Sequence, residues 1–253
     1  MPTRHKNIAK SAQIGEKTTI GKNTIVAENV IIGKNCKIGN NVVIHARSNL
    51  GDNIRIDDNT IVGKLPMFSP RSIFKKEKKF QPTEIDDDCL IGANVVIYCQ
   101  CKIGKKNLIA DLATVRENVD IGDYNIIGRN VTIENYIKIG ERNKFETNSY
   151  ITAYSEIADY CFIAPNATTS NDNYMGRDKE RYKHFQGIIM KKGSRLGVSC
   201  TILPGITINE DGVAAAGSLV TKDIPAQEIW AGTPAKYFKK VPKTQLLKNN
   251  LDK

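Results

Sequence analysis

Residues 103–139 read IGKKNLIADLATVRENVDIGDYNIIGRNVTIENYIKI, with an aliphatic side chain at every sixth position. The same spacing extends on both sides of this stretch. One run of ten such apolar positions begins at Ile8 and ends at Val62, and a second run of fourteen begins at Ile85 and ends at Ile163. A third, weaker run comprises Leu196, Ile202, Ile208, Ala214 and Val220. A fixed period of this kind is the signature of a repeat architecture.

Each six-residue repeat also has a second regular feature. The residue after the periodic aliphatic is usually glycine or alanine, and the residue two before it is usually small or β-branched. Small residues suit a turn. Two inward positions in every six, alternating with outward ones, predict a very short strand followed by a corner. Successive repeats are therefore expected to wrap into a solenoid.

This pattern resembles the hexapeptide-repeat family. The resemblance implies an all-β fold, the left-handed parallel β-helix, with three hexads or 18 residues in each coil. The handedness comes from the resemblance alone, because the usual rule for parallel crossovers favours the opposite hand. About ten coils at the usual inter-strand separation would make a prism about 45–50 Å long.

We expect a single β-helix domain over residues 1–253. The repeat coils are assigned to residues 8–63, 85–164 and 190–222. Residues 64–84 and 165–189 are polar and rich in proline or charge, so they are predicted to be inserted loops, and loops of this length are usually functional or disordered. The tail, residues 224–253, is predicted to form a short basic helix that covers the open end of the solenoid.

The composition narrows the class of protein. The chain has 37 Lys and Arg against 27 Asp and Glu, a formal charge of +10, which suggests a polyanionic or phosphorylated partner. Its 40% hydrophobic content excludes a disordered chain. The polar N-terminus and the absence of a long apolar run predict a cytoplasmic protein without membrane insertion. Six cysteines without paired CxxC spacing favour reduced thiols and no zinc site.

The 18-residue coil allows side chains to be stacked by arithmetic. Asn107, Asn125 and Asn143 are 18 residues apart at one inward position, which predicts a buried asparagine ladder. Five cysteines lie two residues before a periodic aliphatic and are expected to be buried fillers, whereas Cys99 is outside that register. The five are Cys36, Cys89, Cys101, Cys161 and Cys200.

One corner of the predicted prism differs from the other two. In the second run, two corners carry almost only small residues, while the third carries Tyr98, Arg116, Glu134 and Thr152. This column of larger side chains departs from the small residues that the turn favours. It is therefore either a candidate functional site or a solvated polar edge.

Asp111 and His45 are candidates for proton transfer. Asp111 is expected near the edge that bears Arg116, either as a base for an amine nucleophile or as a turn residue paired with Arg129. His45 is at a corner of the first run, whereas His5 and His184 lie outside the repeats. Three widely spaced histidines do not fit the three-His zinc site of the gamma-type carbonic anhydrases, so no metal is expected.

Residues 196–236 resemble the closing coils of acyl-CoA-dependent hexapeptide transferases. The similar elements are Leu203-Pro204-Gly205, Ala216-Gly217-Ser218, Val220-Thr221-Lys222-Asp223 and Ala231-Gly232-Thr233-Pro234-Ala235. The resemblance implies acetyl-CoA, or another acyl-CoA, as co-substrate. Its pantetheine is expected beside small residues and its phosphates beside lysines. The residues assigned to it are Ser199, Ala214, Ala215, Gly217, Lys222 and Lys239, with help from Lys240.

Within that family, the segment NDNYMGR at 171–177 and the stretch 91–118 resemble the branch that acylates nucleotide-linked amino sugars, near the transferases of dTDP-amino-deoxyhexoses. The resemblance implies a cytoplasmic homotrimer with sites between neighbouring prisms, acting in surface polysaccharide synthesis. Asp111 is then the expected base, Glu134 its partner or a sugar ligand, and His45 a reserve. The expected substrate-binding residues are Tyr98, Arg116, Asn171, Asp172 and Arg177.

Other functions stay open at this point. An O-acetyltransferase acting on a sugar or serine hydroxyl would need a stronger base, usually histidine. A non-catalytic solenoid would not need the Lys222 region or the polar corner. A nucleic-acid binder would use the basic loops, but no known module or row of stacking aromatic residues is present. The sequence does not specify the nucleotide, the sugar or the acyl chain.

Overall fold

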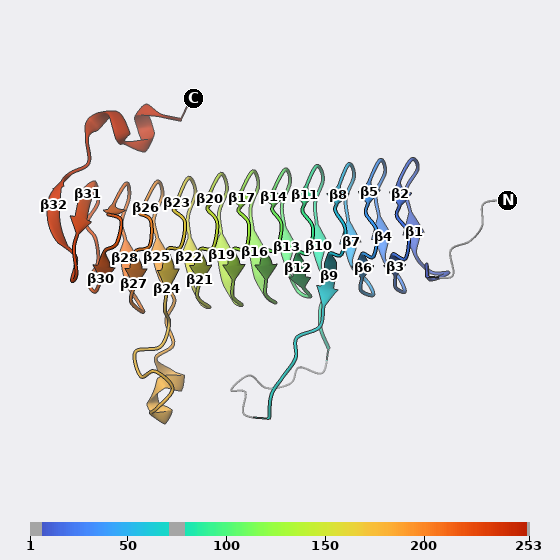
Figure 1. Ribbon diagram of the computed structural model, residues 1–253, viewed down its shortest axis with the longest axis horizontal. Coiled ribbons are helices and arrows are strands. Elements are labelled where there is room, and N and C mark those ends of the chain that lie inside the picture. The colour runs from blue at the N-terminus through green and yellow to red at the C-terminus, as the bar shows by residue number, and fades with distance from the viewer. Residues whose placement is uncertain (1–6, 71–78, 252–253) are drawn as a thin grey trace.

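The computed structural model describes residues 7–70 and 79–251, which form a parallel β-solenoid with three long sheets. Figure 1 shows the coils stacked along one axis, with two loops leaving the same side. The all-β fold class expected from the period is confirmed. His5 and the middle of the first loop, residues 71–78, lie outside the described residues. In the described part of the chain, no helix has the length and apolar character needed to cross a membrane.

From β1 to β30, each sheet is built from every third strand, so consecutive strands belong to different sheets. The first sheet contains β1 Gln13–Ile14, β4 Ile31–Ile32, β7 Asn49–Leu50, β10 Glu84–Ile85, β13 Lys102–Ile103, β16 Val119–Ile121, β19 Ile137–Ile139, β22 Glu156–Ile157, β25 Ile189–Met190 and β28 Thr207–Ile208. The second contains β2 Thr19–Ile20, β5 Lys37–Ile38, β8 Arg55–Ile56, β11 Leu90–Ile91, β14 Leu108–Ile109, β17 Ile126–Ile127, β20 Lys144–Phe145, β23 Phe162–Ile163, β26 Arg195–Leu196, β29 Val213–Ala214, β31 Glu228–Ala231 and β32 Lys236–Lys240. The third contains β3 Ile25–Val26, β6 Val43–Ile44, β9 Ile61–Lys64, β12 Val96–Tyr98, β15 Thr114–Val115, β18 Thr132–Ile133, β21 Tyr150–Ile151, β24 Thr168–Thr169, β27 Thr201–Ile202 and β30 Leu219–Val220.

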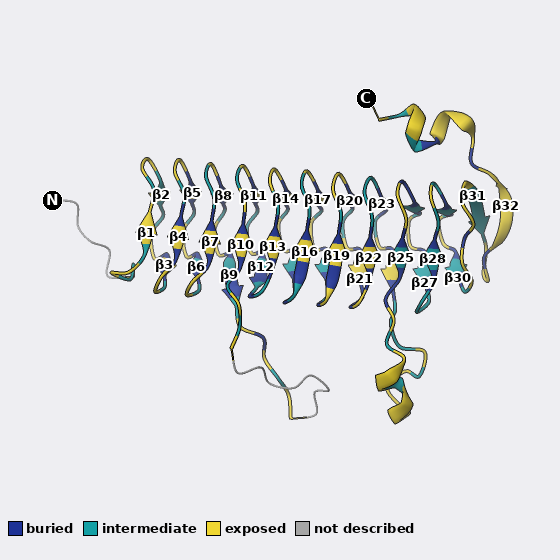
Figure 2. Ribbon diagram, turned by 180° about the vertical axis from the view of Figure 1, so that it is seen from behind, coloured by how far each residue is buried: buried dark blue, intermediate teal, exposed yellow. Residues whose placement is uncertain are grey.

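The periodic aliphatic residues form the core. They stack directly on one another, as where Ile109 pairs with Ile91 on one side and Ile127 on the other. Ile109 and Ile127 are fully buried. Figure 2 shows buried residues in the strands of successive coils from β3 Ile25–Val26 onward, and many exposed residues in the turns between strands. All six cysteines are free and buried, including Cys99.

The corners show why glycine follows the aliphatic residue. A Cβ at Gly122 would lie 2.7 Å from the carbonyl oxygen of Gly140 in the next coil, so close stacking leaves no room for a side chain. The left-handed backbone conformation occurs two residues later, where asparagine is frequent, as at Asn41 and Asn130. Asparagine tolerates this conformation better than most residues.

The predicted asparagine ladder is present. Asn107, Asn125 and Asn143 are at most 1% exposed. The side-chain oxygen of Asn107 accepts from the backbone N–H of Asn125 at 2.7 Å, and that of Asn125 accepts from Asn143 at 2.8 Å. The amide of Asn125 also donates to the carbonyls of Gly122 and Gly140, each at 3.0 Å. The ladder therefore joins side chain to backbone between coils.

The tail differs from the single helix expected. Strand β31 continues the second sheet in parallel beside β29, and β32 folds back antiparallel to it. As far as residue 251, where the described part of the tail ends, two short 3₁₀ turns follow, η2 Lys243–Gln245 and η3 Leu247–Asn249. The β31–β32 hairpin extends the second sheet to twelve strands, whereas the other two have ten, close to the ten coils expected.

A test of the ladder compares two asparagines. Asn125→Ala should lower the free energy of unfolding by roughly 2–4 kcal/mol, because it leaves buried N–H and carbonyl groups without partners. Asn49→Ala, on the exposed outer face of β7, should change it by less than about 0.5 kcal/mol. Urea unfolding followed by circular dichroism measures both. Equal losses would show that the ladder does not stabilise the stack.

Candidate functional site

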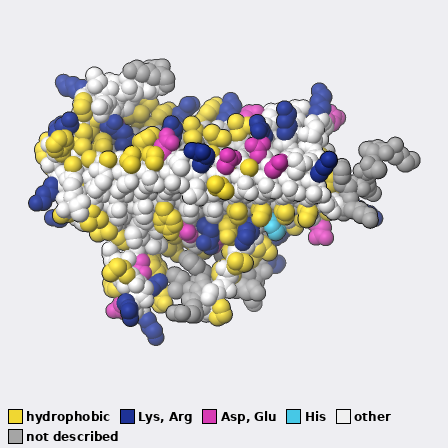
Figure 3. All heavy atoms as spheres, in the orientation of Figure 1, with side chains coloured by type: hydrophobic (Ala, Val, Ile, Leu, Met, Phe, Trp, Pro, Cys, Tyr) yellow, Lys and Arg dark blue, Asp and Glu magenta, His cyan; other side chains and the backbone are white. Residues whose placement is uncertain are grey.

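We call the corner that leads from the third sheet back to the first the loop edge. Both inserted loops leave it: one follows β9 and the other follows β24. Between them, coils carrying Tyr98, Arg116, Glu134 and Thr152 present these residues at the same corner position. In the space-filling view, basic side chains lie along the edge between the two loops (Figure 3). The structure therefore gathers the polar corner predicted from sequence and places a loop at each end of it.

Tyr98 lies between two cations. The Nζ atom of Lys64, one coil earlier, is 3.3 Å from the Tyr98 hydroxyl and 4.5 Å from the ring centroid. The guanidinium carbon of Arg116, one coil later, is 4.9 Å from the same centroid. Each cation is within the range of a cation–π interaction. The two contacts hold the Tyr98 ring on the loop edge, in the coil that follows the first loop.

Arg116 binds two carboxylates. Its Nε and Nη2 atoms donate to the two oxygens of Glu117 at 2.9 and 3.0 Å, and its Nη1 donates to Glu134 at 3.3 Å. Burial opposes the charge of the guanidinium, but the bonds to Glu117 and the nearby Glu134 outweigh that cost and raise the pKa of Arg116. The Glu117 side chain is only 6% exposed, whereas that of Glu134 is 22% exposed and reachable from solvent. Glu117 is thus a structural anion, and Glu134 is the accessible one.

Tyr150 completes the surroundings of Glu134. It lies on the outer face of β21, one coil beyond Glu134. Burial raises the pKa of Tyr150 to about 12, and the charge of Glu134 and a hydrogen bond to it act in the same direction. The phenol therefore stays protonated at neutral pH and can donate to the carboxylate. Glu134 is held between a guanidinium and a phenol.

Asp111 lies at a different corner from Tyr98, Arg116 and Glu134. It follows β14, so it lies at the corner between the second and third sheets, one corner before Arg116. Its Oδ1 atom accepts from the backbone N–H of Ala93 at 2.9 Å. Asp52 and Asp123 make the same bond to the preceding coil. This contact is the turn role that the sequence left open beside the catalytic one.

His45 is on the loop edge but under the first loop. Burial and the nearby Lys64 lower the pKa of His45. It lines a small pocket of about 130 Å³ together with Phe80 and Cys99. Pockets that hold small molecules are usually about 300–1,000 Å³, so this one is too small for a sugar.

The second loop contains Asn171, Asp172 and Arg177. Asp172 organises it: its carboxylate accepts from the backbone N–H groups of Tyr174 at 2.8 Å and Gly176 at 3.1 Å, and pairs with Arg181 at 3.4 Å. The carbonyl of Asn171 accepts from the backbone of Gln186 at 3.3 Å. Arg177 is exposed at the far part of the loop. Asp172 thus shapes the loop, and the exposed charged residues of the loop include Arg177, Asp178 and Lys179.

The residues assigned to acyl-CoA fall into three groups. Ser199, Ala215 and Gly217 lie at the corner between the second and third sheets, and a Cβ at Gly217 would meet nothing within 4 Å. Ala214, immediately before Ala215, is fully buried in β29. Lys222 lies past β30 on the loop edge, and Lys239 lies on β32, with its Nζ 5.3 Å from the Phe238 ring centroid. The small residues therefore make an open edge, but the two lysines lie elsewhere.

Glu117, Lys64 and Tyr150 were not found from the sequence. Glu117 shares its corner position with Cys99, Asn135 and Ala153, all of them buried. The equivalent residues at the corner between the second and third sheets, Asp111 and Arg129, are exposed. Cys99 is the cysteine that does not lie two residues before a periodic aliphatic. This was the one feature of the sequence that indicated inward-pointing side chains at this corner position.

Comparison with known proteins agrees with the repeat. Residues 11–46 and 100–135 match the family model "Bacterial transferase hexapeptide (six repeats)", and residues 82–105 match "Hexapeptide repeat of succinyl-transferase". The matched segments of the chain therefore carry hexapeptide repeats. A 2,3,4,5-tetrahydropyridine-2,6-dicarboxylate N-acetyltransferase of Staphylococcus aureus (strain JH9) is 34% identical over 64 residues. That match covers 25% of the chain and 27% of the relative, so it spans about a quarter of each.

Two solved structures share the solenoid fold of this chain. A UDP-N-acetylglucosamine acyltransferase from Bacteroides fragilis 9343 superposes with a TM-score of 0.54 at 23% identity, covering 91% of this chain and 71% of that one. The Arabidopsis UDP-N-acetylglucosamine acyltransferase gives a TM-score of 0.55 at 18% identity, covering 97% and 76%. At these identities the likeness establishes the solenoid architecture.

The ion pair at the loop edge gives a stability test. Arg116→Met should lower the free energy of unfolding by about 3–5 kcal/mol, because it leaves Glu117 buried and unpaired. Adding Glu117→Gln should restore part of the loss. Arg55→Met, which breaks the exposed bidentate pair with Asp57, should cost much less, because solvent screens that pair. Similar losses for the two single variants in urea unfolding would contradict the assignment of Glu117 as a buried structural anion.

Proposed function

We propose that this protein transfers an acyl group from acyl-CoA to the amino group of a nucleotide-linked amino-deoxy sugar. The observation that carries the proposal is the set Tyr98, Arg116 and Glu134, held at one edge between two loops. The resemblance of residues 196–236 to acyl-CoA-dependent transferases supports the donor, and the resemblance of residues 171–177 supports the acceptor. The names of the matched relative and solved structures, all acyl or acetyl transferases, agree with this reaction class.

The reaction needs three things of the protein. The amine must lie against the thioester carbonyl carbon, the carbonyl oxygen needs a donor as it becomes negative, and one proton must leave the amine. We assign Glu134 as the base that accepts this proton, because its carboxylate is the accessible one beside Arg116 on the loop edge. Asp111 stays a weaker candidate, because its oxygen already accepts from Ala93 at another corner. Free CoA and the N-acyl sugar are the products.

Binding of the two substrates is assigned to different edges. Tyr98, Arg116 and the second loop, with Asn171, Asp172 and Arg177, would hold the acceptor. The small residues at Ser199, Ala215 and Gly217 would leave room for pantetheine along the next corner. The third sheet separates these two edges within one chain. The family resemblance implies a homotrimer. If one chain packs its corner of small residues against the loop edge of a neighbouring chain, the trimer would bring acyl-CoA and the acceptor together.

The first experiment measures CoA release from acetyl-CoA by chromatography. The acceptors are a panel of dTDP- and UDP-linked amino sugars and their hydroxyl counterparts. Release that depends on one amino sugar is the expected result. Release with a hydroxyl sugar instead would favour O-acetyl transfer. No release across the panel, with no binding of CoA, would leave a structural solenoid as the better account.

Variants of the two acidic residues then test the proton acceptor. Glu134→Gln should lower kcat by about 100-fold or more, because it removes the general base while keeping the shape. Asp111→Asn should stay within a few-fold of the parent, as should Asp123→Asn, its equivalent at another corner. If Asp111→Asn alone abolished turnover in folded protein, the base would be Asp111.

A further inference from the structure

The excess positive charge of the chain is concentrated near one end of the solenoid. Residues 229–251 contain five lysines and no aspartate or glutamate, so this stretch carries +5 of the formal charge of +10. All five lysines are exposed: Lys236, Lys239, Lys240, Lys243 and Lys248. The first three belong to strand β32, which lies at the end of the stacked coils (Figure 1). Clustered lysines attract a polyanionic partner unless acidic groups offset them.

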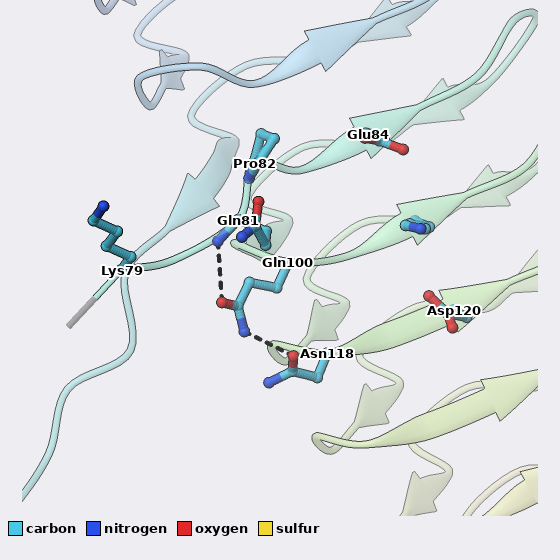
Figure 4. A pocket seen from close by; sticks show the side chains of 8 residues that line it. Lys79, Gln81, Pro82, Glu84, Gln100, Asn118 and Asp120 are labelled. Atoms are coloured by element: carbon cyan, nitrogen blue, oxygen red, sulfur yellow. Dashed lines mark hydrogen bonds between the residues drawn. The ribbon is translucent and has the colours of Figure 1, made fainter. Parts of the chain in front are cut away.

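A groove beside the first loop contains lysines as well, but acidic groups offset them. Its volume is about 690 Å³, and its lining includes Lys79, Lys102, Glu84 and Asp120. Figure 4 shows Lys79, Glu84 and Asp120 around this groove. With two lysines against two carboxylates, the groove has no excess of positive charge.

Acidic groups offset only part of the charge around β32. Glu228 pairs with Lys240, with the Oε1 and Nζ atoms 2.8 Å apart, and this contact raises the pKa of Lys240. Three carboxylates precede the stretch, at Glu210, Asp211 and Asp223, and the last two accept from backbone N–H groups. The other four lysines of the stretch make no ion pair with any residue that the structure describes.

Two aromatic side chains are exposed among these lysines. Strand β32 reads Lys236-Tyr237-Phe238-Lys239-Lys240, and all five residues are exposed. Tyr237 is 54% exposed and Phe238 is 62% exposed. The Nζ atom of Lys239 lies 5.3 Å from the centroid of the Phe238 ring, within the range of a cation–π interaction. Basic and hydrophobic side chains lie side by side at this end of the molecule (Figure 3).

The exposed strand is held firmly at both ends. Ala235 before it and Val241 after it are buried, at 7% and 6% exposure. The backbone N–H of Ala235 donates to the carbonyl of Leu219 at 2.8 Å, and that of Val241 donates to Gln227 at 2.9 Å. The exposure of β32 therefore belongs to an ordered strand and does not arise from a frayed segment.

A bulge accompanies the exposure of Phe238. Ile229 pairs with Lys239 and Trp230 pairs with Tyr237, so Phe238 is the extra residue without a partner on β31. An extra residue in one strand redirects its side chain. Lysines on an edge strand also prevent pairing with another sheet, but that role does not require two exposed aromatic rings.

We propose that the β32 end of the solenoid docks on the surface of an anionic membrane. Aromatic side chains favour the headgroup level of a bilayer, which suits Tyr237 and Phe238. The lysines around them would face anionic lipids, each adding to the attraction. A nucleic acid would need a basic groove that follows its backbone, whereas these residues gather at the end of a prism.

This placement leaves the loop edge accessible. The two loops leave the side of the solenoid, whereas β32 lies at its end (Figure 1). Docking through β32 therefore does not cover Arg116 or Glu134. The inference goes beyond the proposed acyl transfer and does not depend on it.

Vesicle flotation tests the docking directly. The vesicles consist of phosphatidylcholine with phosphatidylserine at about 30%, and a matched set contains phosphatidylcholine alone. The protein should float with the anionic vesicles and stay behind with the neutral ones. Added salt should release it, because salt screens the attraction between lysines and lipid headgroups.

Two variants separate the charged from the apolar contribution. Lys236→Gln combined with Lys243→Gln should weaken binding by roughly 10-fold to 30-fold, since each lysine near an anionic surface contributes about 5-fold. Phe238→Ser should weaken it by about 5-fold to 10-fold, because the ring no longer leaves water on docking. Thermal unfolding followed by circular dichroism confirms that both variants are folded.

Matched controls come from the opposite end of the solenoid. Lys34 and Lys37 are exposed, and Ile31 is 43% exposed. Lys34→Gln combined with Lys37→Gln should bind anionic vesicles like the parent, and so should Ile31→Ser. Weakening by these controls equal to that of the β32 variants would overturn the proposal, because net charge alone would then explain the binding.

Three further results would also overturn the docking site. One is equal binding to neutral and anionic vesicles, and another is unchanged binding in the folded Lys236 and Lys243 double variant. The third is a protein that does not float but binds a single-stranded oligonucleotide through Lys236 and Lys243, which would assign the surface to nucleic acid. CoA release is measured separately, so failure of acyl transfer leaves the result on membrane docking intact.

Discussion

The close stacking of one coil on the next governs the rest of this structure. Backbone hydrogen bonds between coils hold equivalent residues one strand spacing apart, such as Gly122 N–H to the carbonyl of Ile139 at 2.8 Å. At this spacing a corner has room for glycine but not for a side chain pointing at the next coil. At two of the three corners, the residue that follows the periodic aliphatic is therefore usually glycine or alanine, and larger side chains such as Tyr124 and Arg129 occur further along the turn. At the third corner, the loop edge, larger side chains occupy that first position as well.

The loop edge is that exception. In the coils of β16 and β19 the strand after the corner begins earlier, at Val119 and Ile137, and the residues before it are drawn inward. Glu117 and Asn135 are buried, at 4% and 2% exposure, as are Cys99 and Ala153 at the same position of the neighbouring coils. The buried carboxylate requires a cation, and Arg116 supplies it while also contacting Tyr98 and Glu134. The change in the corner thus leads to the cluster of charged and aromatic groups.

The period made most of the fold predictable. An aliphatic side chain at every sixth position shows which residues point inward, and the 18-residue coil shows which residues stack. The asparagine ladder and the five cysteines in register could therefore be predicted by arithmetic. Asp111 precedes Arg116 by five positions, and successive corners are six positions apart. The same arithmetic therefore places Asp111 at the corner before that of Arg116. The tail was harder to predict: a basic, lysine-rich segment resembles a helix, but an unpaired sheet edge at the end of the solenoid favours β31 and β32.

The partners of the site residues could not be predicted in this way. Stacking arithmetic places Tyr98, Arg116 and Glu134 in one column, but it does not say that Glu117 turns inward or that Tyr150 reaches Glu134 from the sheet face. Those contacts depend on side-chain direction at an irregular corner, which a repeat pattern does not encode. Loop residues such as Arg177 are outside the repeat altogether.

The most direct test of this account is a crystal structure with CoA and a nucleotide-linked amino sugar bound together. The account predicts the sugar at the loop edge between the two loops, with its amine near Glu134, and CoA along the corner of Ser199 and Gly217 of the same or a neighbouring chain. A ternary complex with the sugar at the corner between the first and second sheets, away from Arg116 and Glu134, would contradict it.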